Sequence, residues 1–171
     1  MDRYVVIMAG GVGSRFWPSS TETKPKQFLD ITGTGKSLLR MTYERCLPFI
    51  KNENILIVTN KMYQPLVKNE LTELPVENIL CEPSRNNTAP CVAYAALHIN
   101  ARDKESSFAV LASDHIILDE SRFAESLQKA FDFAEANNVL MTLSITPSRP
   151  DTGYGYIELS DDVSEIKKVK T

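Results

Sequence analysis

The sequence is poor in cysteine, with three among 171 residues. Cys46, Cys81 and Cys91 lie far apart along the chain, so they form none of the close pairs typical of a zinc site or a disulfide framework. A free thiol of this kind packs as a small apolar side chain, and we predict reduced, mostly buried cysteines. The low cysteine content therefore argues against a disulfide-stabilised scaffold and against a catalytic thiol.

Long apolar runs and an excess of basic residues are also lacking. No apolar stretch approaches the roughly 20 residues of a membrane span, and the first residues lack the basic and apolar regions of a signal peptide. The net charge of -3 argues against a general nucleic-acid binder. We therefore expect a cytoplasmic chain with no membrane or nucleic-acid partner. Its hydrophobic content of 43% is enough for one core.

A glycine-rich segment near the start of the chain is its most informative feature. The apolar residues Tyr4 to Met8 are typical of a buried strand, and glycine occupies three of the four positions 10–13 directly after it. Ligands of open α/β sheets bind at the carboxyl ends of strands. Backbone N–H groups without shielding side chains can form a concave site for phosphate. The candidate phosphate-binding residues are Ala9, Gly10, Gly11, Val12, Gly13 and Ser14.

Positive charge is concentrated beside this segment, because Arg15 and Lys26 flank it.

Two better-known phosphate loops do not match. A dinucleotide-binding fingerprint requires glycine where Phe16 stands, and a Walker A motif ending in Gly-Thr-Gly-Lys-Ser (33–37) requires glycine where Asp30 stands. Nucleotide binding by a different kind of glycine loop is the leading interpretation.

Apolar periodicity alternates between strand-like and helix-like along most of the chain. It predicts strands at 4–8, 55–58, 76–81, 108–112 and 139–145, and helices at 37–49, 60–74, 89–101 and 121–136. This alternation predicts an α/β fold, a Rossmann-like three-layer αβα arrangement with a mostly parallel mixed sheet. After Pro147 the pattern changes to short strands at 154–159 and 163–170.

Two polar segments follow later strands. In the segment Glu82 to Pro90, Thr88 is predicted to cap the next helix, with Pro90 in its first turn. On spacing alone this segment is equally a turn or a purine site, since the Glu82 carboxylate would accept hydrogen bonds from guanine N1–H and its amine. Asp114 follows another strand. An isolated aspartate there is typical of a turn or cap, although one or two aspartates suffice for Mg²⁺ bound to phosphates.

Four blocks taken in order resemble the sugar nucleotidyltransferases, and among them the mannose-1-phosphate guanylyltransferases. These blocks are Gly10 to Pro18 with Lys24 to Leu29, Glu82 to Pro90, Ala112 to His115, and Thr152 to Glu158. The resemblance spans nearly the whole chain. It implies an enzyme that makes GDP-mannose and pyrophosphate from GTP and mannose 1-phosphate, by in-line attack of the sugar phosphate on the GTP α-phosphorus.

The same resemblance implies roles for individual residues. It assigns Arg15 and Lys26 to catalysis and Asp114 to a Mg²⁺ cofactor. It adds Glu82, Arg85, Asn86 and Thr88 to the nucleotide site formed by the glycine loop, and it assigns Tyr154 and Gly155 to the sugar. Residues 1–147 are then the nucleotide-binding portion and 148–171 the start of the sugar-binding portion. A homodimer is compatible with the resemblance.

The chain departs from the resembled family at its carboxyl end. A Phe-x-Glu-Lys-Pro motif with a lysine for the sugar phosphate, and a second metal-binding aspartate, would follow in the family and are not in this sequence. We therefore interpret the sequence as the amino-terminal part of a longer enzyme. The alternatives are a nucleotidyltransferase for another sugar phosphate or base, and a GTP-binding module without turnover in this form.

Overall fold

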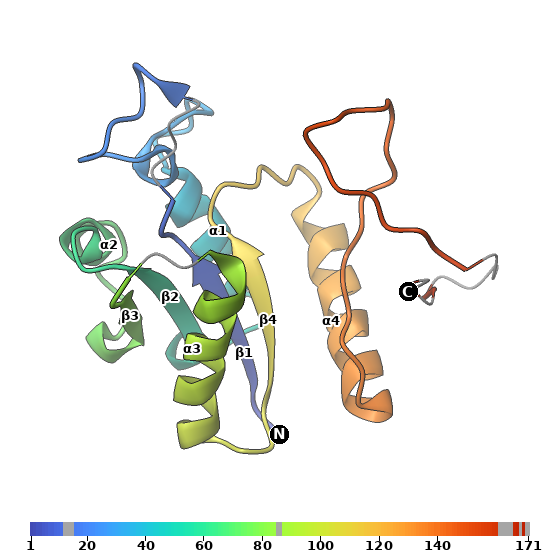
Figure 1. Ribbon diagram of the computed structural model, residues 1–171. Coiled ribbons are helices and arrows are strands. Elements are labelled where there is room, and N and C mark those ends of the chain that lie inside the picture. The colour runs from blue at the N-terminus through green and yellow to red at the C-terminus, as the bar shows by residue number, and fades with distance from the viewer. Residues whose placement is uncertain (12–15, 85–86, 161–165, 168, 170–171) are drawn as a thin grey trace.

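A four-stranded parallel sheet forms the centre of the structure, a computed structural model that describes residues 1–11, 16–84, 87–160, 166–167 and 169. The strand order is β3-β2-β1-β4 (Figure 1). The bounds are β1 Arg3–Met8, β2 Ile55–Asn60, β3 Ile79–Glu82 and β4 Ser107–Ala112. Val6 of β1 is in register with Leu56 on one side and Val110 on the other. Because all four strands are parallel, their carboxyl ends share one edge of the sheet.

Four α-helices connect or follow the strands. They are α1 Leu38–Cys46, α2 Gln64–Glu70, α3 Thr88–Arg102 and α4 Glu120–Asn137, with short 3-10 turns at Lys26–Phe28, Asn52–Asn54 and Val76–Asn78. Side-chain caps fix two of the helix starts. The Ser37 hydroxyl accepts from the Arg40 N–H at 3.0 Å, and the Asp119 carboxylate accepts from the Arg122 N–H at 3.0 Å.

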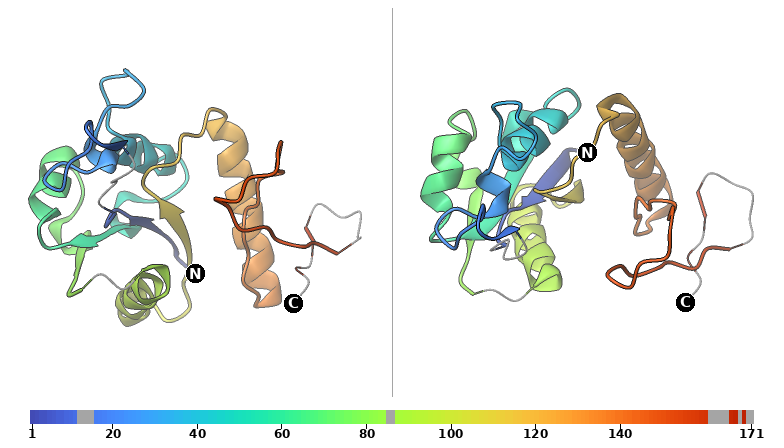
Figure 2. Two further views of the ribbon diagram at one scale, coloured as in Figure 1. Left: turned by 45° about the horizontal axis from the view of Figure 1, so that its top comes forward. Right: turned by 90° about the horizontal axis from the view of Figure 1, so that it is seen from above.

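The two faces of the sheet bury two separate apolar clusters, because successive strand residues point to opposite faces. Val5 and Ile7 pack with residues of α1, α2 and α4. Val6 and Leu56 pack with residues of α3. Figure 2 shows α3 on one side of the sheet and the other helices on the opposite side. The predicted α/β fold with a three-layer αβα arrangement is confirmed.

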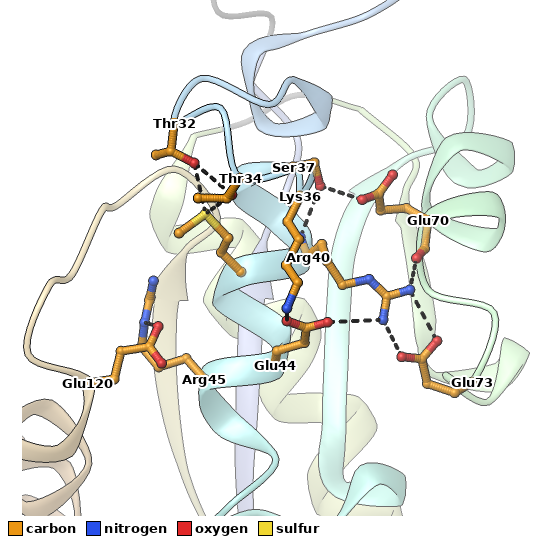
Figure 3. A network of polar contacts seen from close by, with 11 residues as sticks. Thr32, Thr34, Lys36, Ser37, Arg40, Glu44, Arg45, Glu70, Glu73 and Glu120 are labelled. Atoms are coloured by element: carbon orange, nitrogen blue, oxygen red, sulfur yellow. Dashed lines mark hydrogen bonds and ion pairs between the residues drawn. The ribbon is translucent and has the colours of Figure 1, made fainter.

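A polar network joins α1 to α2 and to the turn that follows it (Figure 3). The Arg40 guanidinium forms an ion pair with Glu73 and donates to the Glu70 carbonyl oxygen. The Ser37 hydroxyl donates to Glu70 Oε1 at 2.6 Å. The Arg40 side chain is 20% exposed. Its contacts and those of Ser37 anchor the amino end of α1, next to the segment that carries Lys26.

Three expectations about local structure are corrected. β3 begins at Ile79, after a 3-10 turn, and α3 begins at Thr88, so its cap is Asn87 rather than Thr88. The predicted strand 139–145 is wrong. These residues run back along α4 as coil (Figure 1), with the Leu140 and Ile145 side chains 101% and 89% exposed. Without a hydrogen-bonded neighbour, an apolar segment has no ladder to hold it as a strand.

The carboxyl-terminal residues differ in the same way. Of the predicted strands 154–159 and 163–170, the structure shows one antiparallel bridge between Leu159 and Val169, with residues 161–165, 168 and 170–171 outside the described part. Among the described residues, none of the helices is long and apolar enough to cross a membrane.

Candidate functional site

The candidate site lies at the carboxyl edge of the sheet and begins with the glycine loop after β1. The Ala9 N–H continues the ladder by donating to the Val58 carbonyl at 2.8 Å, and the Ala9 side chain is fully buried. Gly10 lies next to Glu82, which ends β3. A Cβ atom at position 10 would stand 3.7 Å from Glu82 Oε2. The fold thus brings the first and second predicted nucleotide segments together.

Two buried side chains hold the carbonyl groups of this loop. Gln27 Nε2 donates to the Ala9 carbonyl at 3.0 Å and to the Gly11 carbonyl at 2.9 Å. The Thr59 hydroxyl at the end of β2 also donates to the Ala9 carbonyl, at 3.0 Å. Neither Gln27 nor Thr59 was predicted from the sequence as a site residue. For Gln27 the available signal was its place directly after Lys26 in the Pro-Lys-Gln block.

Lys26 and Asp114, predicted separately as a catalytic cation and a metal ligand, are neighbours in the structure. They form an ion pair between Lys26 Nζ and Asp114 Oδ2, with 28% and 24% of their side chains exposed. Lys26 Nζ also lies 5.6 Å from the centre of the Phe16 ring, within the range of a cation–π contact. A basic and an acidic group therefore stand side by side at this edge.

The backbone around Asp114 is held firmly. The Ser113 N–H extends the β1–β4 pairing by donating to the Met8 carbonyl at 3.2 Å, and Ser113 is 5% exposed. The Asp114 carboxylate supplies the hard oxygen that Mg²⁺ prefers, and Mg²⁺ commonly takes one or two carboxylates and completes its shell with water and substrate phosphates. No group of three or more His, Cys, Asp or Glu side chains is arranged for a metal within the described ranges. The donor set fits a phosphate-bound Mg²⁺ rather than a closed protein cage.

Glu82 is half-buried, and burial raises the pKa of its carboxyl above the ordinary value. Its place beside Gly10 fits a group that faces part of a bound nucleotide. Thr88 is exposed at the first position of α3. Asn87 before it has φ 64° and ψ -161°, a strained backbone combination that only glycine adopts readily.

Several predicted site residues cannot be placed. Val12, Gly13, Ser14, Arg15, Arg85 and Asn86 lie outside the described residues. Tyr154 and Gly155 are exposed, in a segment that Figures 1 and 2 show beside α4. The Tyr156 hydroxyl in that segment donates to the Asp151 carbonyl at 3.0 Å. The assignment of Tyr154 and Gly155 to a sugar stays a prediction.

The rival Gly-Thr-Gly-Lys-Ser segment uses its own N–H groups internally. The Asp30 carboxylate accepts from the N–H groups of Gly33 at 2.7 Å, Thr34 at 3.1 Å and Gly35 at 2.7 Å. These bonds lower the pKa of Asp30, with the Gly35 contact the largest cause. Lys36 pairs with Glu44 Oε2 at 2.6 Å. The Asp30 carboxylate thus takes N–H groups that a phosphate would need in this segment.

Comparison with known proteins finds relatives along nearly the whole chain. The chain is 42% identical over 158 residues to a mannose-1-phosphate guanylyltransferase of Escherichia coli K12, which covers 90% of this chain and 32% of that protein. It is 40% identical over 159 residues to the alginate biosynthesis protein AlgA of Pseudomonas aeruginosa, covering 92% and 32%. The chain therefore spans about a third of the length of these curated relatives.

A solved structure and a family model agree with these relatives. The crystal structure described as mannose-1-phosphate geranyltransferase from Thermus thermophilus superposes with a TM-score of 0.88 at 30% identity, over 99% of this chain and 49% of that chain. The sequence model described as nucleotidyl transferase matches residues 4–170. With its parallel sheet and its glycine loop beside Lys26 and Asp114, the chain belongs to the nucleotidyl transferase family.

Proposed function

We propose that this chain carries the nucleotide-binding portion of an enzyme that makes GDP-mannose and pyrophosphate from GTP and mannose 1-phosphate. The observation that carries the proposal is the meeting of Gly10, Lys26, Glu82 and Asp114 at one edge of the sheet. Gly10 follows β1, Glu82 ends β3, Lys26 belongs to the Pro-Lys-Gln turn and Asp114 follows β4. The names of the relatives supply the guanine base and the mannose.

The proposed chemistry requires charged groups and does not require a nucleophile triad. The phosphate of a sugar 1-phosphate is already anionic at neutral pH, so its attack on the α-phosphorus of GTP needs no general base. The chain's task is to position the triphosphate and to neutralise charge on the departing pyrophosphate. In this proposal the glycine-loop N–H groups hold the phosphates, and Lys26 and Arg15 face the pyrophosphate.

Asp114 is the residue that would hold Mg²⁺. The ion, when bound with the triphosphate, supplies positive charge to the phosphate oxygens. The Lys26 ammonium beside Asp114 places a second positive charge at the same edge. Glu82, Arg85, Asn86 and Thr88 are proposed to face the base, and Tyr154 and Gly155 the sugar.

Calorimetric titration of the 171-residue chain with GTP, ATP, CTP, UTP and dTTP, each with Mg²⁺, tests the nucleotide half of the proposal. We expect selective GTP binding that Lys26→Ala weakens. Lys36→Ala is the matched control, since Lys36 belongs to the rival loop and pairs with Glu44. Preference for another base would overturn the guanine assignment. A folded chain that binds no nucleotide would overturn the proposal that it carries a working nucleotide site.

The sugar is tested separately with the full-length protein. Formation of GDP-sugar from GTP is compared with mannose 1-phosphate and with glucose 1-phosphate as acceptors. Higher kcat/KM with mannose 1-phosphate supports the proposed substrate. Selective GTP binding together with a preference for another sugar phosphate would favour a guanylyltransferase of different sugar specificity.

A further inference from the structure

We propose that Gln27 is a positioning residue that turns the Gly10 N–H, at the start of the glycine loop, toward the nucleotide phosphates. The inference rests on the proposed function and goes beyond it, because it names what holds the phosphate-binding loop in shape. Gln27 itself is 2% exposed and makes its side-chain contacts inward, to the loop carbonyls.

The Gln27 amide bridges two points of the loop. Its one NH₂ group has two hydrogens, and its two acceptors are the carbonyl oxygens of Ala9 at 3.0 Å and Gly11 at 2.9 Å. The amide therefore fixes the orientation of the Ala9–Gly10 peptide and of the Gly11 carbonyl group. The Thr59 hydroxyl donates to the Ala9 carbonyl as well, at 3.0 Å, so this carbonyl is held by two side chains, Gln27 from a turn and Thr59 from β2.

The Gln27 backbone is fixed in turn. It lies in the 3-10 turn Lys26–Phe28, closed by the Phe28 N–H to the Pro25 carbonyl at 3.0 Å. The neighbouring Phe28 ring is buried against Tyr63, with ring centres 6.0 Å apart. The amide is thus presented by a turn packed into the core. The same turn carries Lys26. One short segment therefore positions both the Ala9–Gly10 peptide, through Gln27, and the Lys26 ammonium.

Peptide geometry converts the inward Ala9 carbonyl into an outward Gly10 N–H. A trans peptide is planar, and its C=O and N–H point in opposite directions. The Ala9–Gly10 bond is not among the cis peptides of the described chain. Since the Ala9 carbonyl points to Gln27 and Thr59 in the interior, the Gly10 N–H points away from them. It has no hydrogen-bond partner among the described residues.

A purely structural role for Gln27 is the competing explanation, and the chain offers a matched control for it. Asn78 is 1% exposed, and its Nδ2 bridges the carbonyls of Glu53 at 2.9 Å and Ile55 at 2.8 Å. This is the same kind of bridge at the amino-terminal end of β2, away from the glycine loop. Removing either bridge should lower stability. Removal of the Gln27 bridge should also lower phosphate affinity, whereas removal of the Asn78 bridge should not.

The experiment measures the affinity of the 171-residue chain for Mg²⁺–GTP and for inorganic tripolyphosphate by calorimetry. It compares wild type, Gln27→Met and Asn78→Leu, with the thermal midpoint of each recorded. We expect Gln27→Met to weaken both ligands by about ten- to a hundred-fold, the scale of losing one charge-assisted hydrogen bond. Asn78→Leu should lower the thermal midpoint and leave both affinities unchanged.

Gln27→Glu supplies a second readout that does not depend on Gln27→Met folding. A buried carboxyl facing two carbonyl oxygens has a raised pKa and donates only when protonated. The affinity of Gln27→Glu relative to wild type should therefore improve as the pH falls from about 8 to about 5. The positioning role is overturned if folded Gln27→Met binds tripolyphosphate with the affinity of the wild type. It is also overturned if the affinity of Gln27→Glu relative to wild type does not change with pH. In both cases GTP binding by the wild type leaves the proposed function standing, whereas absence of binding by the wild type removes both.

Discussion

Replacing Lys26 by alanine removes the cation that contacts Asp114 and leaves that carboxylate, at the proposed phosphate site, without its partner. Two unit charges about 4 Å apart interact by about 4 kcal/mol at an effective dielectric constant of about 20. With 28% of its side chain exposed, Lys26 is partly screened by water. We expect a net loss of about 3–4 kcal/mol of transition-state stabilisation, or about 10²–10³-fold in turnover.

The assay is GDP-mannose formation by the full-length protein under single-turnover conditions, with folding checked by circular dichroism. Lys36→Ala is the control, because Lys36 is 51% exposed and pairs with Glu44 outside the site. We expect wild-type turnover from that variant. Near-wild-type turnover in folded Lys26→Ala protein would refute the reasoning. The double variant Lys26→Ala with Asp114→Asn should lose less than the product of the single losses, because the two side chains are in contact.

Three further predictions concern stability and reactivity. Arg40→Ala should lower the free energy of unfolding by about 1–2 kcal/mol in urea titrations, since it removes the contacts to Glu73 and Glu70, while nucleotide affinity stays unchanged. Hydrogen bonds from Arg3 lower the pKa of Glu135, so their stabilisation is present above the usual pKa of about 4.3 and is lost as the pH falls through the lower folded value. Glu135→Gln should flatten the acid limb of the unfolding free energy against pH, and an unchanged limb would contradict this. Burial raises the pKa of Cys46 to about 12 and that of Cys91 to about 11, so thiol reagents at neutral pH should label half-buried Cys81 first and the other two only on unfolding.

Local sequence patterns determined most of the fold. The apolar runs that became β1, β2 and β4 are short, continuous and bounded by polar residues, which is the pattern of strands buried on both faces. The four helices follow the 3.6-residue period closely enough that each was predicted within a few residues of its ends. The exceptions are 139–145 and 154–159, whose composition suited strands. Strand formation also requires a neighbouring chain, which local composition does not encode.

The sequence also marked the glycine loop, Lys26, Glu82 and Asp114 as site residues, because each follows a strand or belongs to a distinctive block. Only the tertiary structure decided how they meet. Parallel pairing placed Gly10 beside Glu82, and it brought Lys26 against Asp114 although the two lie far apart in the sequence. The tertiary structure also turned Gln27 inward to the carbonyl groups of Ala9 and Gly11. Such contacts depend on the path of the chain in three dimensions, so one-dimensional periodicity cannot contain them.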